Sequence, residues 1–146
     1  MKHPFLELCK NKIVVLDGAM GTNLQKQFLT PQDFGGKDGC NEYLVITKPE
    51  AVRKIHEDFF AVGCDAVETN SFGSNRIVLA EYGLEDKAFE LNEKAAKLAR
   101  KAANKCATPD HPRFVLGSIG PGTKLPSIGH IGVDELREAT KEQIKG

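Results

Sequence analysis

Residues 13–23 read IVVLDGAMGTN, an apolar run that ends abruptly in a glycine-rich polar loop. The same pattern returns as AVETNSFGSN at 66–75 and as FVLGSIGPGTK at 114–124. Short continuous apolar runs rich in β-branched residues are typical of strands buried on both faces. We therefore expect each run to be a parallel strand whose C-terminal end opens into a functional loop.

A helical pattern separates the first two expected strands. Thr47 and Glu50 have the spacing of a capping box, and Pro49 suits a first helical turn. Gly63 is a natural stop for this helix. Upstream, several breakers predict a long loop over 29–43. The apolar stripe expected on the helix consists of Val52, Ile55, Phe59 and Val62.

Two further helical patterns precede the third strand, and another follows it. We expect a short helix from about Asn75 to Tyr82, closed by Gly83, and a longer one from about Asp86 to Cys106. A last helix is expected to begin at Asp134. The expected apolar positions are Ala88, Leu91, Ala95, Leu98 and Ala102 on the long helix, and Leu136, Ala139 and Ile144 on the last one.

The order of these elements is the repeated βαβ pattern of a parallel α/β sheet. The chain has 146 residues, which fits one domain with a sizeable core. A closed (βα)8 barrel needs about 200 residues or more. The pattern thus predicts either a very small α/β domain or the first part of a larger one.

Composition argues against several classes of partner. Lys and Arg together number 20, as do Asp and Glu, so no basic excess favours nucleic acid or an anionic membrane. Apolar runs stay well below the roughly 20 residues of a membrane span. Charges interrupt the weakly apolar start MKHPFLELCKNK, which disfavours a signal peptide. We expect a cytoplasmic protein.

The cysteines give no metal-binding pattern. Their spacing contains no C-x-x-C pair and matches no zinc ribbon or finger, and the histidines are scattered. We therefore predict no metal site within these residues. Free cysteine is often buried, so reduced thiols in or near the core are expected. The cysteines are Cys9, Cys40, Cys64 and Cys106.

Polar residues gather where the expected strands end. Asp17 could accept a hydrogen bond from a cationic group, and Gly18 and Gly21 would let backbone amides approach a ligand. A tight strand-to-helix turn would also explain the glycines. Strand alternation sends Glu68 and Asn70 to one face and Thr69 to the other. Glu68 could equally be a buried, paired carboxylate.

The third loop leaves other functions open. VLGSIGPGT superficially resembles the first motif of S-adenosylmethionine-dependent methyltransferases, although Ser118 occupies the slot that is usually acidic. It is not a P-loop, because Thr123 stands where a lysine is required. A small nucleotide-binding or S-adenosylmethionine-binding α/β domain remains an alternative, as does a non-catalytic fragment that binds a partner.

Taken together, three stretches are more specific than any single loop. They are VVLDGAMGTNLQ (14–25), NEYLVITKPEAVRKIHEDFFAVGCDAVETNSFGSN (41–75) and LGSIGPGTKLPSIGHI (116–131). They resemble the homocysteine-binding module of cobalamin-dependent methionine synthases, within the homocysteine S-methyltransferase family. The resemblance implies that residues 1–146 are a partial homocysteine-binding domain, truncated at the C-terminus. It would be the N-terminal portion of a (βα)8 TIM barrel, with about three βα units and parallel strands.

The resemblance also implies a chemistry and its partners. The module binds homocysteine, and a zinc ion held by three cysteines activates the sulfur for attack on the methyl group of methylcobalamin. The product is methionine. The partners would be the remaining barrel and the folate and cobalamin modules of the full-length chain. Betaine-type or S-methylmethionine-type enzymes share this barrel, as does a bifunctional homocysteine methyltransferase/methylenetetrahydrofolate reductase.

Residue by residue, the resemblance assigns substrate contacts but no catalytic residue. The family's zinc cysteines, including a Cys-Cys pair, lie on later strands. Zinc and cobalamin are thus expected in the full-length enzyme, with none bound by this fragment, which we expect to be inactive alone. The matching positions at the amino-acid end of homocysteine are Asp17, Gly18, Ala19, Met20 and Ser118, with Glu68, Thr69 and Asn70 also matching the family pattern.

Overall fold

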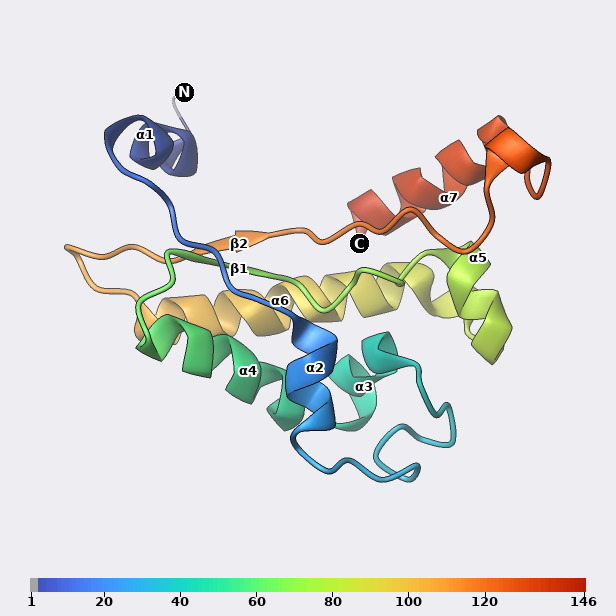
Figure 1. Ribbon diagram of the computed structural model, residues 1–146, viewed down its shortest axis with the longest axis horizontal. Coiled ribbons are helices and arrows are strands. Elements are labelled where there is room, and N and C mark those ends of the chain that lie inside the picture. The colour runs from blue at the N-terminus through green and yellow to red at the C-terminus, as the bar shows by residue number, and fades with distance from the viewer. Residues whose placement is uncertain (1–2) are drawn as a thin grey trace.

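Helices α4 (Pro49–Ala61) and α6 (Ala88–Cys106) pack on the same side of a small parallel sheet in the computed structural model, which describes residues 3–146 (Figure 1). The strands β1 (Ala66–Glu68) and β2 (Phe114–Leu116) pair in parallel, with Ala66 beside Phe114 and Glu68 beside Leu116. The α-helices are α1 Pro4–Asn11, α2 Met20–Gln25, α3 Leu44–Thr47, α4 Pro49–Ala61, α5 Arg76–Leu79, α6 Ala88–Cys106 and α7 Val133–Lys145. Short 3₁₀ turns are η1 Asn41–Tyr43, η2 Ala80–Tyr82, η3 Glu85–Lys87 and η4 Pro126–Ile128.

The expected strands at 66–68 and 114–116 are confirmed, but 13–16 is not a regular strand. Only Leu16 forms a parallel bridge, to Ala66, although the segment runs beside β1. The amide of Val15 donates to the Asp65 carboxylate at 2.9 Å, so a side chain replaces the backbone carbonyl that would accept this hydrogen bond in a regular sheet. Ile13 is 88 % exposed, consistent with a segment that β1 contacts on one side.

Helix α4 begins at Pro49, but the expected capping box is wrong. The Thr47 hydroxyl donates to the Tyr43 carbonyl at 3.2 Å, because residues 44–47 form helix α3. That short helix was not predicted. Val62 lies just beyond the end of α4 and is 81 % exposed, so it does not extend the apolar stripe as expected.

The later helices follow the sequence pattern closely. The expected helix at 75–82 is α5 followed by η2, and Gly83 closes it in the left-handed conformation with φ 65°. Helix α6 buries small residues against the sheet and its neighbours, including four of the five predicted positions; Leu98 is only partly buried. On α7, Ala139 is buried as expected, whereas Ile144 is exposed and Gln143 is buried in its place.

The N-terminal ends of the strands are tied together by a buried carboxylate. Asp65 accepts hydrogen bonds from Lys12 Nζ at 2.8 Å and from the Val15 amide, and contacts His111 Nε2 at 2.9 Å. Burial alone would raise the pKa of Asp65, but these donors outweigh it and lower the pKa to about 2. Asp65 therefore holds the 13–16 segment, β1 and the turn before β2 in one arrangement.

The prediction that the cysteines lie in or near the core holds for three of the four and is wrong for Cys9. Cys40 and Cys64 are buried, Cys106 is half-buried and Cys9 is exposed. None of the helices in residues 3–146 combines the length and apolarity that a membrane crossing requires.

Candidate functional site

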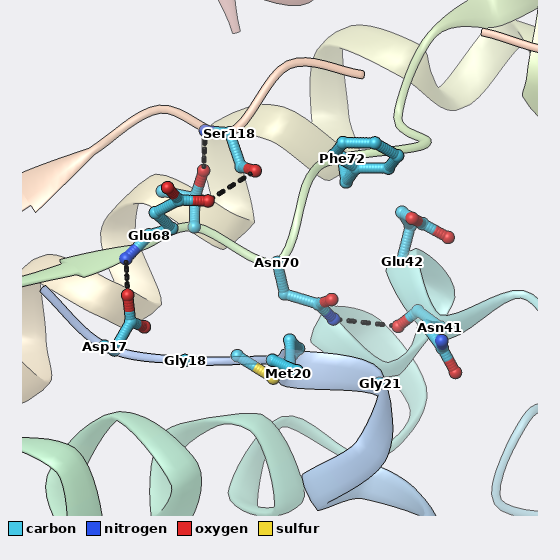
Figure 2. Close-up of a pocket in the computed structure, with 12 residues that line it drawn as sticks. Asp17, Gly18, Met20, Gly21, Asn41, Glu42, Glu68, Asn70, Phe72 and Ser118 are labelled. Atoms are coloured by element: carbon cyan, nitrogen blue, oxygen red, sulfur yellow. Dashed lines mark hydrogen bonds between the residues drawn. The ribbon is translucent and has the colours of Figure 1, made fainter. Parts of the chain in front are cut away.

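A cavity of about 410 Å³ lies at the carboxyl ends of the strands (Figure 2). All of the residues assigned to the site from the sequence line it, together with three that were not. Its lining consists of Asp17, Gly18, Ala19, Met20, Gly21, Asn41, Glu42, Glu68, Thr69, Asn70, Phe72 and Ser118.

Asp17 is fixed at one side of the cavity by the last residue of β1, Glu68. Its Oδ1 accepts a hydrogen bond from the Glu68 amide at 3.0 Å. Burial raises the pKa of Asp17 to about 6; the nearby Glu68 carboxylate adds to the rise, and the bond from the Glu68 amide opposes it. Asp17 is thus a carboxyl group that changes charge close to neutral pH.

Hydrogen bonds that involve polar side chains hold the ends of β1 and β2 together. Ser118 Oγ donates to Glu68 Oε2 at 3.0 Å, and the Ser118 amide donates to Thr69 Oγ1 at 3.0 Å (Figure 2). The Ser71 hydroxyl donates to the Ser118 carbonyl at 2.9 Å and lies 2.6 Å from Thr69 Oγ1. Thr69 is therefore buried in this network, while the exposed Glu68 lies at the cavity.

Asn70 connects the strand end to the segment before α3. Its Nδ2 donates to the Asn41 carbonyl at 2.8 Å. Period-two alternation does not extend past Glu68, because β1 ends there, and Glu68, Thr69 and Asn70 all line the same cavity. Thr69 lines the cavity but is buried, whereas Glu68 is exposed, so the two side chains have different surroundings.

Asn41, Glu42 and Phe72 are lining residues that the sequence did not indicate. All three fall within the stretches that carry the family resemblance. The pattern gave no signal for Asn41 and Glu42, because a residue in a turn between helices has no periodicity to indicate its direction. In the sequence Phe72 is a single aromatic residue in a polar loop, and this pattern does not indicate a ligand contact.

The cavity is acidic. Among its lining residues, all in the described part of the chain, there are three carboxylates and no cationic side chain: Asp17, Glu42 and Glu68. Carboxylates in a partly enclosed site favour a ligand with a positive charge, since charged hydrogen bonds are stronger there than in water. Gly18 adds exposed backbone next to Asp17, and Gly21 adds half-buried backbone. The arrangement suits a small molecule with an ammonium group.

The described residues do not form a zinc centre of the kind the resemblance implies. No three His, Cys, Asp or Glu side chains in residues 3–146 meet as metal ligands. Burial raises the pKa of Cys40 to about 11 and also raises that of Cys64, whose thiol donates to the Leu16 carbonyl at 3.3 Å. Burial thus opposes the thiolate form that zinc requires.

A parallel α/β sheet with an acidic cavity at the carboxyl ends of its strands defines the class of α/β proteins that bind small polar ligands at that rim. The chain belongs to the homocysteine S-methyltransferase family, whose family model matches residues 14–146. It is 46 % identical over 141 residues to a methionine synthase of Mycobacterium leprae and 45 % identical to one of Mycobacterium tuberculosis. Each alignment covers 97 % of the chain, which spans only 12 % of either relative.

Solved structures show the same fold. The metallated form of the homocysteine methyltransferase MmuM from Escherichia coli matches with a TM-score of 0.75 at 25 % identity, over 98 % of this chain and 52 % of that one. The oxidised form matches with a TM-score of 0.67 at 27 % identity, over 82 % and 41 %. The α/β fold class is thereby confirmed.

Proposed function

We propose that this chain supplies the amino-acid side of a homocysteine pocket in an enzyme that methylates homocysteine to methionine. The observation that carries the proposal is the acidic cavity in which Asp17 and Glu68 flank exposed glycine backbone. The ammonium group of an amino acid would sit between these carboxylates. Its carboxylate would take backbone amides near Gly18 and Met20.

Family membership favours this function over a nucleotide or S-adenosylmethionine site in the third loop. Two amides of that loop already have partners: Ser118 N donates to Thr69 Oγ1, and Gly120 N donates to the Phe72 carbonyl at 3.0 Å. A loop that cradles phosphate needs its amides free to bind the ligand. These bonds instead shape the cavity.

We further propose that residues 1–146 are the N-terminal portion of a (βα)8 barrel, with the remaining barrel and the folate and cobalamin modules supplied by a longer protein. Exposed apolar residues beside β1 support this: Ile13, Val15 and Leu16 lie at the outer edge of the sheet. Further strands would cover them. The cytoplasmic location expected from composition stays a prediction.

Zinc and cobalamin belong to the same proposal but not to these residues. When bound, zinc would lower the pKa of the homocysteine thiol, so that the thiol loses its proton and the sulfur is a thiolate at neutral pH. Because the donor set described above does not fit it, its ligands would come from elsewhere in the protein. The identity to methionine synthases, higher than to MmuM, favours methylcobalamin over betaine or S-methylmethionine as donor.

Titration of the ¹⁵N-labelled chain with L-homocysteine tests the substrate assignment. We expect resonances of residues 17–21, 68–72 and 118 to shift together. Asp17→Asn should weaken binding roughly tenfold, as expected for loss of one charge-assisted hydrogen bond. Asp110→Asn is the matched control, because Asp110 is exposed and lies outside the cavity. Equal affinity in wild type and Asp17→Asn would contradict the proposal.

Activity gives a separate test. We expect no methionine from the 146-residue chain supplied with homocysteine and methylcobalamin. The ordinary pKa of a free thiol is about 8.5, so it stays mostly protonated at neutral pH unless ligands or charges lower that pKa. Measurable methionine formation by the chain alone would show that its own residues activate the sulfur.

A further inference from the structure

Phe72 is the one aromatic side chain among the described lining residues of the cavity, and it is 59 % exposed. In Figure 2 it lies across the cavity from Glu68 and Asp17. An exposed ring in an otherwise polar cavity leaves apolar surface that a ligand could cover. A ligand held at its ammonium end by the carboxylates would extend its aliphatic chain toward this ring.

The backbone of Phe72 is not held by regular secondary structure. Residues 69–73 lie outside helices and strands. Instead, two contacts from distant segments flank the residue. The Gly120 amide donates to the Phe72 carbonyl at 3.0 Å, and Glu42 Oε1 accepts from the next amide, that of Gly73, at 2.8 Å.

Close contacts at Gly120 and Gly73 leave no room for a side chain at either position. A Cβ at Gly120 would lie 2.7 Å from the Phe72 carbonyl oxygen and 2.8 Å from the ring atom Cε1. A Cβ at Gly73 would lie 2.7 Å from Glu42 Oε1. Real Cβ atoms do not approach so closely, so any side chain at Gly120 must displace the ring or its backbone.

We propose that Phe72 is the apolar wall of the pocket and that Glu42 and Gly120 are positioning residues that hold it there. This rests on the proposed function, because it places the aliphatic chain of an amino acid against the ring. The ammonium end gives charge recognition, whereas Phe72 gives selectivity for chain length. Glu42 acts on the position of Phe72 through the Gly73 amide.

The positioning part can be tested without ligand. Gly120→Ala and Glu42→Ala should abolish the nuclear Overhauser contacts between the Phe72 ring and residue 120, and Glu42→Ala should speed hydrogen exchange at Gly73 at least tenfold. Glu42→Gln retains an oxygen acceptor and should restore both. Gly132→Ala is the matched control, since a Cβ there meets nothing and its φ is −72°. Unchanged ring contacts and exchange in Glu42→Ala would overturn the assignment of Glu42.

The wall is tested by the ratio of affinities for L-homocysteine and L-alanine. Phe72→Ala should lower homocysteine affinity roughly tenfold and leave alanine affinity unchanged, because only the longer chain reaches the ring. Glu42→Ala should lower the ratio in the same direction. An unchanged ratio in Phe72→Ala would overturn the wall. Absence of homocysteine binding by wild type would overturn the proposed function and the wall with it, while the ligand-free contacts still decide the positioning.

Discussion

Asp17 is the group in the cavity whose charge depends on pH in the neutral range. With a pKa of about 6, about a tenth of Asp17 is ionised at pH 5 and about nine tenths at pH 7. A cationic ligand binds the ionised form. We therefore expect affinity for L-homocysteine to rise roughly tenfold from pH 5 to pH 7. Calorimetric titration across this range measures it.

Asp17→Asn serves as the comparison for that pH dependence. The amide cannot ionise, so its affinity should be low and nearly flat between pH 5 and pH 7. A wild-type profile parallel to that of the variant would show that another group governs binding. The raised pKa also affects the free energy of unfolding. Because the pKa of Asp17 is higher in the folded than in the unfolded chain, Asp17 stabilises the fold below its ordinary pKa, and this contribution is lost as the pH rises through 6.

His56 makes folding sensitive to acid. It is fully buried in α4, and within residues 3–146 neither ring nitrogen has a hydrogen-bond partner. Burial lowers its pKa to about 4. The stabilising contribution is complete above the ordinary pKa of about 6.5 and is lost as pH falls toward 4. We expect a loss of about 3 kcal/mol in the free energy of unfolding over this window.

Denaturant unfolding of His56→Leu at several pH values isolates this effect. The difference between wild type and variant in the free energy of unfolding should change by about 3 kcal/mol between pH 7 and pH 4. His130→Leu, at an exposed position, should track the wild type. A constant difference between wild type and His56→Leu would mean that the ring is solvated or paired in solution.

At the scale of elements, Asp65 determines whether the 13–16 segment stays on the sheet. Lys12 is half-exposed, so the main cost of removing Asp65 is the Val15 amide left without its acceptor, about 2 kcal/mol. We expect Asp65→Ala to lose about that much stability and to speed hydrogen exchange at the Asp17 amide, which bonds to the Ala66 carbonyl. Asp58→Ala, in an exposed pair with Lys54, should cost less than about 1 kcal/mol. Slow exchange at Asp17 in Asp65→Ala would refute this role.

Asp65 also shows how far the sequence could predict these elements. The strands at 66–68 and 114–116 and helix α6 follow from local apolar patterns, since their side chains pack where periodicity sends them. The 13–16 run has the same pattern, but the carboxylate of Asp65, distant in the sequence, accepts the hydrogen bond of the Val15 amide. Thr47 likewise has the composition of a helix cap, yet its hydroxyl bonds within α3. Such long-range choices leave no local signal.

The same contrast holds within the site. The strand ends placed Asp17, Glu68 and Ser118 correctly at one cavity, because parallel strands bring their carboxyl ends to one edge. Glu42 could not be predicted, since it reaches Gly73 across 31 positions in the sequence. Gln143 was hidden too: it donates from α7 to the Ser71 carbonyl at 2.8 Å, at a helix position where the pattern favoured its apolar neighbour.

At the scale of the whole molecule, the exposed edge of the sheet predicts self-association. Ile13, Val15 and Leu16 present exposed apolar side chains beside β1, as an uncovered sheet edge does. In sedimentation velocity, the 146-residue chain should therefore form larger species as concentration rises. Its thermal unfolding should be broad and poorly reversible.

A charge on the edge should reverse this association. Ile13→Lys places a lysine where natural edge strands carry one, and should raise the monomer fraction at fixed concentration with little effect on stability, because the side chain is already exposed. Val62→Lys is the matched control: Val62 is also exposed, but it lies just beyond the end of α4 rather than in the 13–16 segment. Equal rescue by both would attribute the effect to net charge. A wild-type chain that stays monomeric and unfolds sharply and reversibly would show that the edge needs no further strands.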